Sequence, residues 1–156
     1  EVFKFGARCT CGKVEVAIET LEKAPPVRMV CYCSDCRGYY ESLDRLAIEK
    51  GLPPSAILDQ WGGVDWTAMY PRDINILKGK DNLKTTAIRP SSSIRQVYAS
   101  CCHTPMFRFG GMSVLMNSNL IPNGIQAKLP IEYRIIGRNA WKEEQGGKTE
   151  QPLPPA

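Results

Sequence analysis

Seven cysteines in three short clusters constrain this chain more than any other feature of its sequence. The clusters are Cys9 and Cys11, then Cys31, Cys33 and Cys36, and then Cys101 and Cys102. An odd number of cysteines, with two Cys-X-Cys pairs too close for internal disulfides, is typical of metal-bound thiolates in a reducing compartment. We therefore expect a cytoplasmic protein that binds zinc, not a secreted disulfide framework.

Length and composition favour one globular domain. The 156 residues are 43% hydrophobic and 23% charged, which is ordinary for a chain that buries its own core. No apolar run approaches the ~20 residues of a membrane span. The net charge of +4 comes from scattered basic residues, so we expect no nucleic-acid or membrane partner and leave a homo-oligomer open. From residue 142 the sequence is rich in Lys, Glu, Gln, Gly and Pro, which predicts a domain over residues 1–141 and a flexible C-terminal tail over 142–156.

Hydrophobic periodicity predicts a mainly β fold with one main helix. Val14, Val16 and Ile18 alternate with polar or small residues, so the first cluster should lie in a hairpin between two strands. Apolar residues recur at helical spacing from 36 to 47, with Ser34 as the expected N-cap and Gly51 as the stop. Further strands are expected in these runs: Val27–Tyr32, Ile57–Trp61, Thr67–Tyr70, Ile74–Leu77, Leu83–Ile88, Ile94–Ala99 and Ile131–Ile136.

The first and third cysteine clusters together could supply one closed metal site. Cys9 and Cys11 are two residues apart, so in extended backbone both side chains point the same way and supply half of a tetrahedral set. The strand that ends at Cys101 and Cys102 is the obvious donor of the other half. His103, the single histidine, is ranked behind Cys102 and Cys101 as a ligand, because adjacent residues rarely all chelate one ion. The alternative is a set of small buried cysteines without a metal.

The middle cluster predicts an open site. Cys31 and Cys33 share one face, and Cys36 returns from the first turn of the expected helix, where the backbone N–H groups favour a thiolate. Asp35 should face away, so a fourth protein ligand is not evident. Three ligands leave a position for water or a substrate. The alternative is a distant fourth ligand and a purely structural site.

The order of these motifs resembles the glutathione-dependent formaldehyde-activating enzyme family, whose zinc-bearing, β-rich fold is called Mss4-like. The resemblance is carried by Cys9-Thr-Cys11-Gly12, by Cys31-Tyr-Cys33-Ser-Asp-Cys36-Arg37 and by Cys102-His-Thr104-Pro105. It implies a catalytic zinc on Cys31, Cys33 and Cys36 and a structural zinc on Cys9, Cys11 and the third cluster, two ions per chain. The family's usual Cys-X-X-Cys-Gly-Thr is replaced here by Ala99-Ser-Cys101-Cys102-His103-Thr104, which resembles a divergent branch with vicinal cysteines.

The resemblance implies a carbon–sulfur lyase of the S-(hydroxymethyl)glutathione synthase type, acting on a small-molecule thiol or thiol adduct. A thiol bound at an open zinc position would lose its proton and attack an aldehyde. Arg37 is a candidate for the substrate's carboxylates, and Tyr39 or Tyr40 a candidate proton donor or core residue. Two other hypotheses remain: a non-catalytic binding module with two closed zinc sites, and a nucleic-acid-associated zinc protein.

Overall fold

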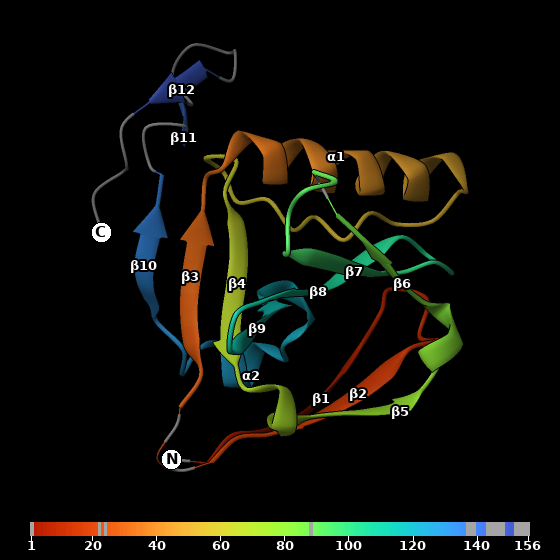
Figure 1. Ribbon diagram of the computed structural model, residues 1–156, viewed down its shortest axis with the longest axis vertical. Coiled ribbons are helices and arrows are strands. Elements are labelled where there is room, and N and C mark those ends of the chain that lie inside the picture. The colour runs from red at the N-terminus through yellow and green to blue at the C-terminus, as the bar shows by residue number, and fades with distance from the viewer. Residues whose placement is uncertain are drawn as a thin grey trace.

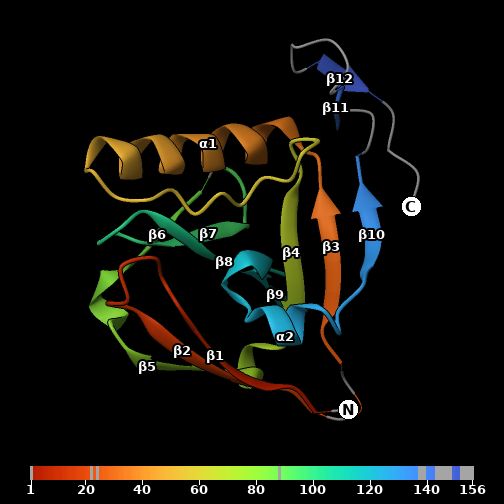
Figure 2. The ribbon, with the colours of Figure 1, turned by 180° about the vertical axis from the view of Figure 1, so that it is seen from behind.

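The computed structural model describes residues 2–21, 23, 25–87, 89–136, 140–142 and 149–151. The fold is mainly β, as expected, with one long helix lying across one end and a small sheet closing the other (Figures 1 and 2). In the described part of the chain, no helix is both long and apolar enough to span a bilayer.

The larger sheet has seven strands in the order β10-β3-β4-β9-β8-β7-β6. Strand β10 pairs with β3 in parallel, and the other neighbours pair antiparallel. The strands are β3 (Val27–Cys31), β4 (Val64–Met69), β6 (Leu83–Thr86), β7 (Arg95–Ala99), β8 (Thr104–Gly110), β9 (Ser113–Asn117) and β10 (Ile131–Ile135).

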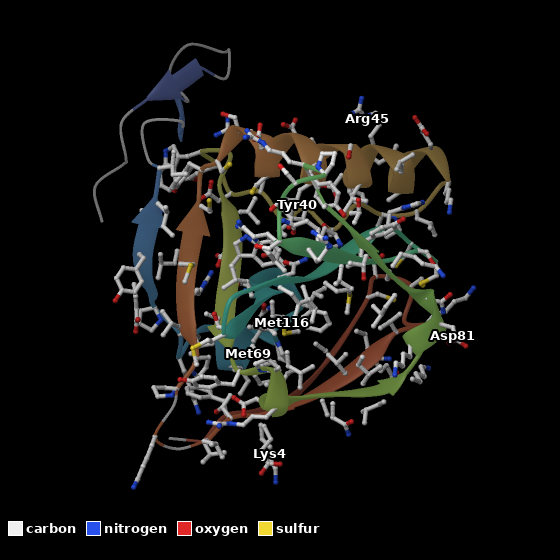
Figure 3. The ribbon with its side chains drawn as sticks, in the orientation of Figure 1. Lys4, Tyr40, Arg45, Met69, Asp81 and Met116 are labelled. Atoms are coloured by element: carbon white, nitrogen blue, oxygen red, sulfur yellow. The ribbon has the colours of Figure 1, made fainter. Side chains whose placement is uncertain are left out.

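The smaller sheet contains β1 (Lys4–Arg8), β2 (Glu15–Glu19) and β5 (Ile74–Lys78). The expected hairpin between the first two strands is confirmed, because β1 pairs antiparallel with β2. Val16 and Ile18 are buried while Glu19 is exposed, so the alternation turns one face of the sheet inward. That face packs against β7, β8 and β9, and Met106 and Met116 lie fully buried in this core (Figure 3).

Helix α1 (Ser34–Glu49) buries a stripe and exposes the rest. Figure 3 shows Tyr40 reaching from α1 into the interior and Arg45 pointing outward. The expected N-cap is wrong by one residue, because Ser34 is the first helical residue and Cys33 precedes it without a side-chain cap hydrogen bond. The expected stop at Gly51 is confirmed: this residue has φ +73°, a conformation that glycine adopts at little cost.

The strands of the structure differ from the sequence predictions in two places: one expected strand is a loop, and one hairpin was not expected. The run Ile57–Trp61 is a loop with a single bridge between Leu58 and Val64. Its apolar Ile57 packs beneath α1, so it is buried by the helix without joining a ladder. The β8–β9 hairpin was missed, since β8 lies inside the sheet between β9 and β7 and its first four residues are all buried, which removes the alternation.

Short helical segments connect the strands: the turns Pro71–Asp73, Lys80–Asn82 and Ser118–Leu120, and α2 (Asn123–Gln126). Strands β11 (Ala140–Lys142) and β12 (Thr149–Gln151) form a separate antiparallel pair. The flexible tail expected over 142–156 falls largely outside the described residues and stays a prediction.

Candidate metal centre and adjoining thiol cleft

Two turns from different sheets bring the first and third cysteine clusters together. Cys9 and Cys11 lie in the β1–β2 turn, and Cys101 and Cys102 lie in the β7–β8 turn. Their four sulfurs all lie within 4.8 Å of one another. Cys9 Sγ is 3.7 Å from Cys11 Sγ and 3.9 Å from Cys101 Sγ, and the sulfurs of Cys101 and Cys102 are 3.9 Å apart. Sulfurs at tetrahedral corners about 2.3 Å from an ion would be about 3.8 Å apart. This group could therefore hold a metal ion.

The β1–β2 turn is shaped around the sulfur of Cys9. Its backbone closes with hydrogen bonds from Gly12 N to Cys9 O, 3.0 Å, and from Cys9 N to Val14 O, 3.1 Å. The Val14 N–H also donates to Cys9 Sγ at 3.3 Å. Gly12 has φ +80°, which lets the chain reverse immediately after Cys11. Local backbone geometry thus presents both sulfurs without help from a bound ion.

The hydroxyl groups of Thr10 and Thr104 lie beside the buried sulfur of Cys102. Although burial acts to raise it, hydrogen bonds from Thr10 and Thr104 lower the pKa of Cys102 to about 6. Thr104 Oγ1 is 2.9 Å from the sulfur and 3.0 Å from Thr10 Oγ1. Burial and neighbouring thiols raise the pKa of Cys9 and of Cys101. One proton therefore leaves near neutral pH, and removal of the others would be favoured by a cation.

His103 does not belong to the sulfur group. Its ring stacks on Tyr98, with centroids 6.0 Å apart and 15° between the planes. Both ring nitrogens are buried and have no hydrogen-bond partner among the described residues. Its backbone has φ +58°, and its N–H donates to Ala99 O at 2.7 Å, so the residue closes the turn after the vicinal cysteines. The ranking of Cys102 and Cys101 before His103 agrees with this geometry.

The middle cluster is arranged differently. Cys31 ends β3 and Cys36 lies in the first turn of α1, and both are buried. A hydrogen bond from the Cys36 thiol, opposed by burial, lowers the pKa of Cys31 to about 6, and the same bond with burial raises the pKa of Cys36. Within the described chain, these two and Cys33 do not form a group whose sulfurs all lie within 4.8 Å. The three expected ligands thus form a buried thiol pair with a third, partly exposed thiol beside it.

Two adjoining hollows open at this thiol pair. The first, of about 180 Å³, is lined by Cys31 and by apolar residues of four neighbouring strands. The second, of about 120 Å³, is lined by Cys33, Cys36 and polar residues of the segment between β6 and β7. Ile94 and Arg108 line both hollows, so we treat them together as the thiol cleft. Larger hollows of about 810 and 530 Å³ lie on the smaller sheet and are not lined by a cysteine.

The cleft corrects the sequence-based choice of basic residue. Arg37 is buried, and its guanidinium donates to backbone oxygens of Gly62, at 2.9 Å, and Tyr32, at 3.4 Å, which fixes the start of α1. Arg108 and Arg89 are instead the cations that line the cleft. Sequence reasoning missed Arg108 because it missed β8, and no spacing relative to the cysteines marks this residue.

Other candidates near the cleft also have defined positions. Tyr40 is a core residue whose hydroxyl donates to Gln96 Oε1, and burial raises its pKa well above the usual range. Burial likewise raises the pKa of Tyr39, whose hydroxyl has no partner in the described structure. Asp35 lines the second hollow, paired with Arg89. Its carboxylate thus meets Arg89, and among the described residues it belongs to no group with the cysteines that could hold a metal ion.

Fold and site together define a β-rich domain with one long helix and a four-cysteine group able to hold a metal ion. Residues 4–136 match the family described as a family of unknown function (DUF6151), and the chain belongs to that family. No curated protein matches the sequence.

A solved structure resembles the fold. It is the crystal structure of a Rhodobacter sphaeroides protein determined as a structural genomics target, with a TM-score of 0.52 and 16% identity. The match covers 83% of this chain and 99% of that one. At this identity the likeness concerns the fold alone.

Proposed function

We propose that the protein is an enzyme of thiol chemistry, of the carbon–sulfur lyase or thiol-adduct type, that works at the thiol cleft and is stabilised by zinc. The observation that carries the proposal is the buried Cys31–Cys36 pair beside Arg108 and next to a hollow, where a hydrogen bond from Cys36 lowers the pKa of Cys31 to about 6. A thiolate with a lowered pKa is the reactive form of cysteine near neutral pH.

Zinc is proposed for the four outer cysteines, because a set of four thiolates is the usual environment of a structural zinc ion. When bound there, the metal would clip the β1–β2 turn to the β7–β8 turn. The second zinc expected on Cys31, Cys33 and Cys36 stays a prediction. The Arg108 guanidinium, whose charge acts on Cys31 and Cys36, disfavours a divalent cation at that place.

In this proposal the residues of the cleft have separate tasks. Cys31 is the nucleophilic sulfur that meets the carbon of a substrate, and the Cys36 thiol stabilises its charge by hydrogen bonding. Tyr40 and Gln96 hold the helix and the sheet in register beneath the pair. Arg37 fixes the turn that carries Cys33.

The test combines metal analysis with turnover. Cys31→Ser and Cys11→Ser variants are compared with the wild type for zinc per chain and for formation or cleavage of adducts between small thiols and aldehydes. We expect Cys31→Ser, which replaces the proposed nucleophilic sulfur, to keep the zinc of the outer site and lose turnover, and Cys11→Ser to lose that zinc. Retained turnover in Cys31→Ser at wild-type rate would rule out the cleft as the reactive centre.

A second candidate function is a non-catalytic, zinc-stabilised binding module. It is favoured by one observation: among the described residues, the outer four cysteines are the group of ligand-type side chains gathered closely enough for one ion. Wild-type protein with one zinc per chain, and no turnover with any thiol and aldehyde pair, would support the module.

A further inference from the structure

Arg108 stands at the centre of the thiol cleft. It lies on β8, in register with Gln96 of β7 and Leu115 of β9, in the strand that crosses the molecule beneath α1 (Figures 1 and 2). The side chain is half-buried and lines one hollow with Cys31 and the other with Cys36, and its charge acts on both sulfurs. Within the described residues, no carboxylate forms an ion pair with it.

A half-buried guanidinium without a carboxylate is unusual because it has five N–H donors and loses hydration. By contrast, Arg28 forms a forked ion pair with Asp65, and Arg89 pairs with Asp35. Donors on Arg108 therefore remain for an anion that enters the cleft.

The hollows limit the size and nature of that anion. At about 180 and 120 Å³ they are smaller than the ~300–1,000 Å³ of sites for drug-sized ligands. Met29, Leu115 and Ile135 give the larger hollow an apolar wall. Trp66 also lines it, is fully buried, and its indole N–H has no acceptor in the described chain. A fitting ligand is short, carries an anionic group and a carbon body, and offers a hydrogen-bond acceptor.

We propose that Arg108 is a specificity-determining residue that selects small organic carboxylates, with the carboxylate on its guanidinium and the reactive atom of the ligand at Cys31. This inference deepens the proposed function, on which its reactive centre rests. It names the substrate class as short carboxylates that bear an electrophilic carbon, such as an aldehyde carbon, in place of a bulky peptide adduct.

The test uses two alkylating probes, iodoacetate and iodoacetamide. They share the reacting carbon and differ by one negative charge, so the ratio of their rate constants at Cys31 reports charge recognition and cancels changes in thiolate reactivity. Peptide mapping assigns the modified cysteine. Relative to free cysteine at the same pH, we expect the ratio to favour iodoacetate by about tenfold, the effect of one charge-assisted hydrogen bond.

Variants identify the residue responsible. In Arg108→Gln the ratio should fall to the value for free cysteine, whereas Arg108→Lys should keep part of the preference. Arg95→Gln is the matched control, because Arg95 is an exposed arginine on the neighbouring strand β7. A ratio in Arg108→Gln equal to that of the wild type would overturn the proposal. Absence of reaction at Cys31 with both probes would also overturn it, because the ligand must reach that sulfur.

A measurement on the wild type alone covers the case in which the Arg108 variants do not fold. Propionate should slow the alkylation of Cys31 by iodoacetamide, and propionamide at the same concentration should not. Equal protection by the two compounds would contradict the proposal. Turnover is measured separately. Charge selection without turnover would contradict the proposed enzyme function and support the anion site. Turnover without charge selection would support the enzyme function and contradict the anion site.

Discussion

The outer four cysteines and the middle three differ in what faces the sulfur atoms. The outer group joins two turns that are 92 residues apart along the chain, and its members face further thiols and two threonine hydroxyls. The middle group comes from one strand–helix junction and faces the guanidinium of Arg108. A group of thiols that face one another can lose protons and bind a metal cation. Thiols that face the positive charge of an arginine lie in a place that suits an anionic ligand. The charge that a sulfur cluster meets is thus a better guide to its role than the number of cysteines.

The largest effect should follow removal of the metal from the outer group. We expect a chelator, or Cys102→Ser, to unfold the domain or lower its Tm strongly, because structural zinc contributes up to ~10–16 kcal/mol in small zinc domains and this domain should have only ~5–15 kcal/mol in total. Calorimetry and circular dichroism measure the change. Cys33→Ser is the control from the middle group and should shift Tm by only a few degrees. If the Tm were the same with and without the chelator, a stabilising role for a metal ion in the outer group would be ruled out.

A smaller loss is expected from the core beneath the thiol cleft. Tyr40→Phe leaves the buried carbonyl of Gln96 without its donor, which costs about 1–3 kcal/mol. Denaturant unfolding of the variant measures this cost. Zinc content should stay at the wild-type value, because Tyr40 lies on the buried face of α1 and is not part of the outer cysteine group. If Tyr40→Phe lost zinc, the two regions would not be independent.

The lowered pKa of Cys31 in the middle group predicts a pH dependence of stability and of reactivity. The pKa of Cys31 is lowered to about 6 from an ordinary value of 9.0. Its thiolate therefore stabilises the fold fully above pH 9, and this contribution falls as the pH drops from about 9 to about 6. The alkylation rate of Cys31 by iodoacetamide should accordingly rise with a midpoint near pH 6. In Cys36→Ala, which removes the thiol donor, the midpoint should move back toward 9; a profile identical to the wild type would show that Cys36 does not set it.

The smallest effect concerns the ion pair at the mouth of the second hollow. Asp35 and Arg89 are both largely exposed, so Asp35→Asn should change the free energy of unfolding by less than ~1 kcal/mol. The substitution frees Arg89 for an incoming anion. The preference of Cys31 for iodoacetate over iodoacetamide should then rise by a factor of about two to three, and Asp44→Asn, farther along α1, serves as the control. A fall in the preference would mean that Arg89 does not face the ligand.

Much of the fold could be predicted from local patterns. The alternation of Val16 and Ile18 predicted the first hairpin, and the spacing of Cys36, Tyr40 and Leu43 predicted α1, because each element has one buried face. Strand β8 could not be found this way, since it is buried on both sides. The loop at Ile57 is the converse case, because a helix covers its apolar side chain where a sheet was expected.

In the candidate site, too, local features could be predicted from the sequence and contacts across the sheet could not. The pairing of the first and third clusters was predicted because each offers half of a tetrahedral ligand set, and the structure brings the four sulfurs together. The extended backbone expected at Cys9 and Cys11 is instead a turn. Arg108, by contrast, meets Cys31 only through the pairing of β8 with β7 and β9. Arg37 was chosen because it follows Cys36 in the sequence, yet helix geometry buries it against Gly62. Contacts across a sheet carry no signal in a single sequence.

The β7–β8 hairpin serves both regions. Its turn holds Cys101 and Cys102, while Gln96 and Arg108 pair farther along the same two strands. Strand β7 ends at Ala99, so at about 3.4 Å per residue the three steps from Gln96 to Ala99 span about 10 Å, and the cysteines lie in the turn after them. At such a separation substitutions act almost independently. Substitutions at the open end of this hairpin can therefore change the ligand that the cleft binds while the turn with its cysteines stays the same. Related proteins could in this way differ in chemistry and keep the same fold.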